Sequence, residues 1–264
     1  MTPALDRFVH VEHVMGTVVS FDFRGGNPPA GALERAIAWL HEVDARFSPY
    51  LPDSEISRLV DGTLAERDAH PDVCAVLAMC DALRVDSDGA FDARRWSSDG
   101  RLDPSGLVKG WAVQRAADEL DAAGVRDFAI GAGGDIVTRG EPELGRAWRV
   151  GIRHPREADH VAAVLAVTDL AVATSATYER GAHIRDPRSG RAPDDLQSLT
   201  VVGPSLTWAD AYATTAFVLG LDGLAWVADH AGYGAVAISN DDRVIWTPIV
   251  DPDAGYLEMA ARRP

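Results

Sequence analysis

The segment VHVEHVMGTVVSFDF, residues 9–23, is the first in this chain with a clear secondary-structure pattern. Its residues are rich in β-branched types and partly alternate between apolar and polar, which predicts a β-strand. The sequence GGNPPAG then breaks the pattern. Apolar side chains recur at helical spacing from Ala32 to Phe47, which predicts an amphipathic helix. Strand and helix therefore both occur within the first fifty residues.

The rest of the chain continues with both kinds of element. Asp53 or Ser54 is placed to cap a short helix that runs through Leu59. Further helices are expected from Pro71 to about Val85, at 109–123, from about Ala209 to Leu219 and at 222–230. Strands are expected at 127–138, 147–154, 161–167, 170–175, 198–203, 233–239 and 243–249. Because the two types do not alternate regularly, the pattern predicts an α+β fold, in one domain over residues 1–264.

Composition and charge narrow the class of protein. The 264 residues include 25 Lys and Arg against 40 Asp and Glu, a net charge of −15. This balance argues against a nucleic-acid partner, and an anionic ligand would need a local metal ion or helix N-terminus to hold it. No apolar run is long enough to span a membrane. The first residues show no apolar signal segment, so a cytoplasmic location is expected.

Two segments carry side chains suited to an anion or a metal. The turn at 103–106 leads into the helix expected at 109–123, with Lys109 in its first turn. This arrangement suits an anion, and it is equally compatible with a plain capped helix. Asp210 and Thr214 are four residues apart, hence on one helix face. Their oxygens suit Mg²⁺, although Asp210 could instead complement the helix dipole.

Two other segments are more ambiguous. His183 precedes a stiff turn at Asp186-Pro187 and Ser189-Gly190, where it can exchange protons near neutral pH or simply be a surface residue. The segment IGAGGDIVTRG, 130–140, has three glycines in five residues. Their spacing does not open a helix, so a close backbone approach or a bulge is expected rather than a dinucleotide site.

Taken together and in order, the motifs resemble those of the ApbE family, the FAD:protein FMN transferases. The matching motifs are Met15-Gly16-Thr17, FSPYLPDSEIS at 47–57, GAFD at 89–92, DPSGLVKG at 103–110, GGD at 133–135, TSATYERGAHIRDPRSG at 174–190 and ADAYAT at 209–214. Ser105 stands where the family usually has glycine, and Ser189 where it usually has threonine. Both replacements are small and polar, so we interpret them as harmless to the resemblance, which spans residues 15–220.

The resemblance implies mixed, largely antiparallel sheets with packed helices, a T-fold-like architecture. It implies Mg²⁺-dependent transfer of the FMN moiety of FAD to a Ser or Thr hydroxyl of an acceptor protein, with release of AMP. By position, the implied FAD contacts are Met15, Tyr50, Ala90, Phe91, Asp92, Asp103, Lys109 and Ile184. The implied Mg²⁺ ligands are the side chains of Asp210 and Thr214 and the backbone carbonyls of Gly106 and Ala213.

For the proton transfer, His183 is the candidate general base and Asp186 its candidate orienting partner. Three alternatives stay open at this stage. Water could replace the acceptor hydroxyl, giving an FAD pyrophosphatase. The chain could instead be a flavin-binding module without turnover, or a metal hydrolase that does not use flavin. Release of AMP from FAD, with or without flavin left on an acceptor, separates these possibilities.

Overall fold

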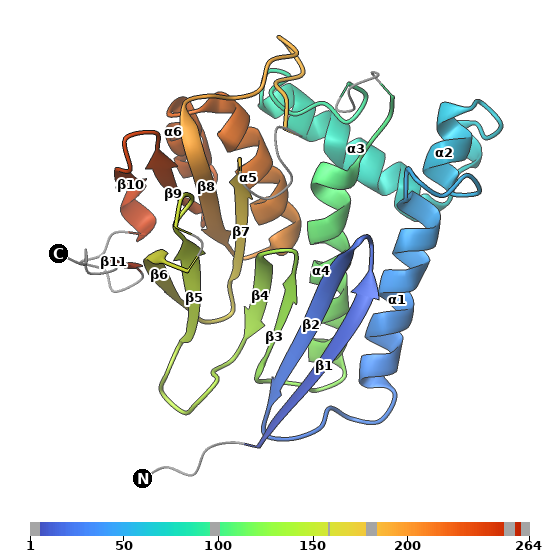
Figure 1. The fold of residues 1–264 in the computed structure, drawn as a ribbon. Coiled ribbons are helices and arrows are strands. Elements are labelled where there is room, and N and C mark those ends of the chain that lie inside the picture. The colour runs from blue at the N-terminus through green and yellow to red at the C-terminus, as the bar shows by residue number, and fades with distance from the viewer. Residues whose placement is uncertain (1–5, 96–100, 158, 178–183, 251–256, 260–264) are drawn as a thin grey trace.

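The computed structural model describes residues 6–95, 101–157, 159–177, 184–250 and 257–259. Within these residues the strands form two antiparallel sheets, one in the order β1-β2-β3-β4-β7-β8-β9-β10 and one in the order β11-β6-β5 (Figure 1). Their bounds are β1 Arg7–Val14, β2 Thr17–Arg24, β3 Phe128–Ala132, β4 Asp135–Arg139, β5 Trp148–Arg153, β6 Val161–Val167, β7 Ala171–Ala176, β8 Leu196–Gly203, β9 Gly234–Ser239, β10 Val244–Trp246 and β11 Leu257–Met259. The expected combination of helices with largely antiparallel sheets is confirmed.

Two hairpins replace two of the predicted long strands. The segment 9–23 belongs to β1 and β2, which are joined by Met15 and Gly16 with φ of 55° and 65°. Likewise, 127–138 contains β3 and part of β4, joined by Gly133-Gly134 with φ of 56° and 92°. Positive φ at both central residues is typical of two-residue hairpin turns. Because such a turn is so short, the strand pattern runs through it almost unbroken.

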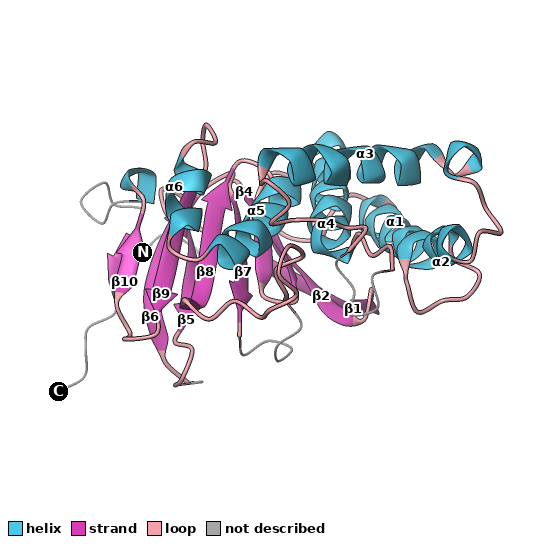
Figure 2. Cartoon of the chain, turned by 90° about the horizontal axis from the view of Figure 1, so that it is seen from above, coloured by secondary structure: helices cyan, strands magenta, loops and turns pink. Residues whose placement is uncertain are grey.

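The helices cover one face of the larger sheet (Figure 2). They are α1 Ala32–Phe47, α2 Glu55–Val60, α3 Pro71–Asp86, α4 Ser105–Ala122, α5 Leu206–Leu219 and α6 Asp222–Ala228. The bounds of α1 agree with the prediction, and Ser54 caps α2 by accepting a hydrogen bond from the Ser57 amide at 3.1 Å. Contacts of α4 with both α1 and α5 form a continuous layer, whose apolar residues share one core with the sheet.

Two helices begin earlier than predicted, which changes the position of their functional residues. α4 begins at Ser105, whose amide donates to the Asp103 carboxylate at 3.0 Å. Lys109 therefore lies in the second turn of α4, and its predicted place in the first turn is wrong. α5 begins at Leu206, so Asp210 is its fifth residue. Since the helix dipole acts mainly on the first turn, it does not account for this buried aspartate.

The three-stranded sheet packs against the other face of the larger sheet. Apolar side chains of β5 and β6 meet side chains of β7, β8 and β9 to form a second core. The strand predicted at 243–249 is shorter than expected, because β10 ends at Trp246 and a 3-10 turn occupies Pro248–Val250. Because the three-stranded sheet covers one face of the larger sheet, the site described next lies on the other face, between the helices and the strand ends.

Candidate active site

A cavity of about 410 Å³ lies between the helical layer and the strands. Its walls come from the tip of the β1–β2 hairpin, the end of α1 with the loop after it, the first turns of α4, the end of β7 and the middle of α5. Of the predicted site residues, those that line it are Met15, Tyr50, Asp103, Gly106, Lys109, Ile184, Asp210 and Thr214. The fold thus gathers residues almost two hundred positions apart.

Other predicted residues do not line this cavity. Among the described ones these are Ala90, Phe91, Asp92, Ala213 and Asp186, and His183 lies outside the described residues. Ala90 and Phe91 are fully buried. A Cβ placed on Gly106 would lie 3.1 Å from Cε2 of Phe91, so this ring packs against the start of α4. Phe91 therefore lies behind the start of α4 and not among the residues that line the cavity, and its flavin contact stays a prediction.

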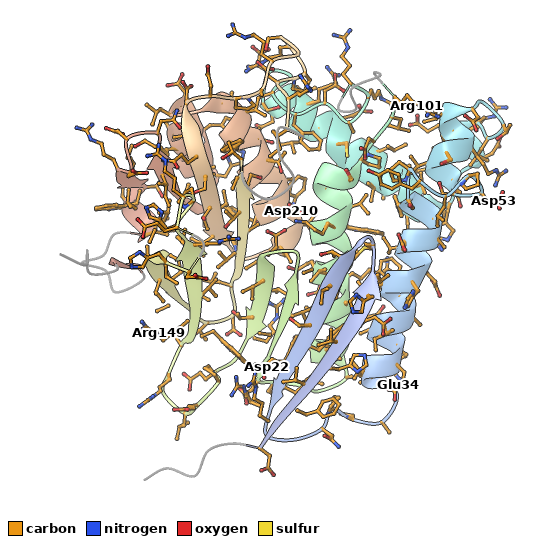
Figure 3. All side chains as sticks on the ribbon, in the orientation of Figure 1. Asp22, Glu34, Asp53, Arg101, Arg149 and Asp210 are labelled. Carbon is orange, nitrogen blue, oxygen red and sulfur yellow. The ribbon has the colours of Figure 1, made fainter. Side chains whose placement is uncertain are left out.

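Asp210, labelled in Figure 3, reaches the cavity from α5, which packs closely against α4. At the crossing, a Cβ on Gly110 would lie 2.5 Å from the Leu206 carbonyl oxygen and 2.7 Å from Cβ of Asp210. Only glycine fits between the two backbones. The Gly110 amide donates to Oδ2 of Asp210 at 2.9 Å, which fixes the orientation of the carboxylate.

Lys109 and two buried carboxylates form an ion cluster, of which Lys109 and Asp210 line the cavity and Asp135 lies behind them. The Lys109 ammonium contacts Oδ2 of Asp135 and lies 3.5 Å from Oδ1 of Asp210. Asp135 is 1% exposed, and its Oδ1 accepts a hydrogen bond from the Thr174 amide at 3.1 Å. Two carboxylates face one ammonium, so this cluster is short of positive charge.

The surroundings of Asp210 shift its protonation. Burial raises the pKa of the Asp210 carboxyl to about 7, and the positive charge of Lys109 opposes that rise. The charge of Asp135 acts in the same direction as burial. Near neutral pH, this carboxyl is therefore partly protonated. A cation bound in place of the proton would stabilise its ionised form.

The oxygens around Asp210 suit a hard divalent cation. Thr214, one turn further along α5, also lines the cavity, and its hydroxyl is 3.2 Å from the Ser175 hydroxyl. Carboxylate and hydroxyl oxygens are ligands that Mg²⁺ accepts. In the part of the chain that the structure describes, no three His, Cys, Asp or Glu side chains form a metal cluster. The donor set fits a Mg²⁺ that takes its remaining ligands from phosphate and water, which is usual for nucleotide sites.

The N-terminus of α4 also faces the cavity. Asp103, Ser105 and Gly106 line the wall there, and α4 is a helix of 18 residues. The first amides of a helix and the positive end of its dipole favour an anion. With Lys109 one turn further along, this wall is suited to a phosphate group.

The remaining lining is largely apolar and includes one exposed ring. Met15 and Ile184 contribute apolar surface, and Ile184 is only 6% exposed. Tyr50, in the loop after α1, is 90% exposed and thus lies at the mouth. These side chains are available to contact a planar ring system.

Asp186 belongs to a tight turn of its own. Its carboxylate accepts hydrogen bonds from the Arg188 guanidinium at 2.9 Å and from the Ser189 hydroxyl at 3.2 Å. Partial burial acts to raise the pKa of Asp186, but the hydrogen bonds from Arg188 outweigh it and hold the pKa below its ordinary value. Asp186 is therefore an ionised carboxylate already engaged by its own loop.

Sequence reasoning missed two polar residues of the site. Asp135 ends the GGD motif and Ser175 lies in the TSATYER segment, both of which were noted only as parts of the family pattern. Asp135 on β4 contacts Lys109 of α4, and Ser175 on β7 lies beside Thr214 of α5. In both cases the strand and the helix are separate segments of the sequence. The motifs were the only signal for them, because nothing local to 133–135 or 174–175 points to α4 or α5.

A sequence model described as the ApbE family matches residues 15–96 and 93–237. The chain belongs to this family. Among similar proteins, the FAD:protein FMN transferase of Rhodobacter capsulatus is 35% identical over 56% of this chain and 30% of its own length. That of Vibrio cholerae is 32% identical over 61% of this chain and 48% of its own length. The matched part thus spans less than half of these two relatives.

A longer match and two solved structures support the family fold. The FAD:protein FMN transferase of Haemophilus influenzae is 24% identical over 79% of this chain and 78% of its own length. The flavin transferase ApbE from Vibrio cholerae superposes with a TM-score of 0.80 at 22% identity, covering 92% of this chain and 97% of that one. The ApbE protein from Thermotoga maritima superposes with a TM-score of 0.80 at 21% identity, covering 92% of this chain and 98% of that one.

Within the described residues, no helix has the length and apolar character needed to cross a membrane.

Proposed function

We propose that this ApbE-family chain transfers the FMN moiety of FAD to a Ser or Thr hydroxyl of an acceptor protein. The acceptor oxygen bonds to the phosphorus of the FMN half, and the bond from that phosphorus to the bridging oxygen breaks. AMP leaves with the bridging oxygen, and the hydroxyl proton passes to a base. The names of the curated relatives support this reaction.

The observation that carries the proposal is the buried Asp210–Thr214 oxygen pair beside Lys109. Among the described residues that line the cavity, the charged ones are Asp44, Asp103, Asp210 and Lys109. A pyrophosphate would meet three carboxylates and one ammonium there, so it needs further positive charge. Mg²⁺ held by Asp210 and Thr214, with carbonyls of Gly106 and Ala213, would neutralise phosphate oxygens and stabilise charge that develops during transfer.

The protein's own groups would then bind the donor and orient it. Lys109 and the N-terminus of α4 would bind the phosphates. Met15 and Ile184 would pack on the donor and keep water from its phosphorus, while Tyr50 would cover the mouth. AMP is a good leaving group because a phosphate has a second pKa near about 6.

The attacking hydroxyl needs more help than the leaving group. A Ser or Thr hydroxyl is a weak nucleophile until a base accepts its proton. His183 directly precedes Ile184 in the chain, and Ile184 lines the cavity. We assign the general base to His183. Asp186 would hold the loop through Arg188 and Ser189, in addition to any orienting role.

One incubation tests the function. The protein is mixed with FAD and Mg²⁺, with and without the flavin-free acceptor protein of a curated relative. We expect AMP to appear together with flavin fluorescence that stays on the acceptor in a denaturing gel. AMP with only free FMN would instead indicate a pyrophosphatase, and FAD binding without AMP would indicate a binding protein. An Asp210→Asn variant serves as the inactive control.

A further inference from the structure

Asp135 is a buried charge next to the candidate metal site, on a strand rather than on the helices that hold that site. Its Oδ1 is fixed by the Thr174 amide at 3.1 Å, so β7 determines where the carboxylate lies. Its Oδ2 contacts the Lys109 ammonium. A carboxylate that is 1% exposed and held by the backbone cannot move far to follow its partner.

Lys109 is bound unequally by its two acidic neighbours. It contacts Asp135 closely, whereas Oδ1 of Asp210 is 3.5 Å away. The other oxygen of Asp210 is already used by the Gly110 amide at 2.9 Å. Oδ1 is thus the Asp210 atom left for a metal ion, and it is the atom on which Lys109 competes.

The Lys109 ammonium and a divalent cation on Oδ1 of Asp210 would repel each other strongly, because the ammonium is only 3.5 Å from that oxygen. At the same separation, a divalent cation repels an ammonium twice as strongly as a second monovalent cation does, and the reduced dielectric constant of a buried site strengthens this repulsion relative to water. A Lys109 that settled fully on Asp210 would therefore exclude the metal. The position of Asp135 prevents this, because it offers the ammonium a second carboxylate.

We propose that Asp135 is a positioning residue that holds Lys109 away from Oδ1 of Asp210, so that a divalent cation can bind there while the ammonium stays on the cavity wall for a phosphate. The inference rests on the proposed metal site at Asp210. It assigns Asp135 an effect on metal affinity through Lys109, and no contact with the reacting atoms.

The test measures direct Mn²⁺ binding to the full chain at pH 8, by electron paramagnetic resonance of free Mn²⁺, without FAD. Mn²⁺ takes the same oxygen ligands as Mg²⁺. Asp135→Asn should lower Mn²⁺ affinity by about tenfold or more, because Lys109 turns to Asp210. Lys109→Met should raise it. The double variant should return to within a few-fold of the parent, since the site again carries one negative charge.

Other results would overturn the proposal. If Asp135 serves only to stabilise the fold, Lys109→Met will not restore the affinity lost in Asp135→Asn. Should Asp135→Asn fail to fold, Lys109→Met alone decides, because unchanged or lower Mn²⁺ affinity contradicts competition at Asp210. The variant Asp210→Asn separates the two levels. If it binds Mn²⁺ like the parent, the proposed metal site is wrong; if it loses Mn²⁺ while Asp135→Asn does not, only the role of Asp135 is wrong.

Discussion

Asp210 shows at the scale of one residue how burial prepares a ligand. One of its oxygens is fixed by the Gly110 amide, while the other faces Lys109 at 3.5 Å. Burial raises the pKa of this carboxyl to about 7 against the opposing charge of Lys109. A proton and the proposed metal ion would therefore compete for the same carboxyl near neutral pH.

This competition predicts the pH dependence of metal binding. A group with a raised pKa is protonated below that value, so Mn²⁺ affinity should rise with pH between about 5 and 7 and then level off. The slope should approach about tenfold per pH unit at the acidic end, because one proton must leave. Titration of Mn²⁺ at fixed ionic strength checks this. An ordinary exposed aspartate would give a flat profile over the same range, and Asp210→Asn should lose this Mn²⁺ binding at every pH.

His183 gives a second prediction at this scale. In His183→Ala, binding of FAD and metal should persist, since neither requires a proton acceptor. AMP release in a single turnover with acceptor should fall by about 10²–10⁴-fold. The parent rate should increase with pH as the imidazole loses its proton, because the neutral imidazole is the base. If the variant retains the parent rate and pH profile, His183 is only a loop residue.

At the scale of elements, the α4–α5 crossing determines the site. Lys109 and Gly110 lie on α4, and Asp210 and Thr214 lie on α5. Neither helix holds a complete set of ligands. Their close approach at Gly110 brings the Gly110 amide and the Lys109 ammonium to the Asp210 carboxylate. The packing of the two helices therefore assembles the polar groups of the site.

Gly110→Ala should therefore harm both stability and metal binding. The added methyl group would lie 2.5 Å from the Leu206 carbonyl oxygen, which forces the helices apart. We expect a loss of about 1–3 kcal/mol in the free energy of unfolding, measured with urea. Gly151→Ala is the matched control, because its methyl group would meet Val161 at an ordinary 3.4 Å. Equal stability of the two variants would show that the crossing is not tight.

At the scale of the whole molecule, charge sets a condition on ligand binding. The chain carries a net charge of −15, while the proposed donor is itself an anion. The cavity has one cationic side chain, Lys109, among its described lining residues. Attraction would therefore be local, from the proposed metal ion, the ammonium and the N-terminus of α4.

The metal should consequently distinguish FAD from FMN. With Mg²⁺ present, FAD should bind more tightly than FMN, because its pyrophosphate and AMP half add contacts near Asp210. A chelator should weaken FAD binding strongly and FMN binding much less. Flavin fluorescence titrations in the two conditions measure this difference. Equal affinities for both flavins, unaffected by chelator, would contradict the proposed site.

Several elements were predictable from sequence because their signals are local. The helix from Ala32 to Phe47 follows from apolar spacing, and the end of α5 before Gly220 follows from a glycine with φ of 66°. Both hairpins were read as single strands, since two-residue turns hardly disturb the alternation. The start of α4 was placed too late because the Asp103 carboxylate accepts a hydrogen bond from the amide of Ser105, the first residue of the helix, and spacing does not reveal this contact.

The sequence by itself determined the mixture of helices and strands, the net negative charge that leaves an anionic ligand to a local metal ion or helix N-terminus, and the motifs that identify the family. Tertiary structure alone decided that Asp135 meets Lys109 and that Phe91 packs beneath Gly106. The reason is physical. Propensity and periodicity act over a few neighbouring residues, whereas a site made from β4, α4 and α5 depends on which backbones approach closely enough to bury two carboxylates around one ammonium.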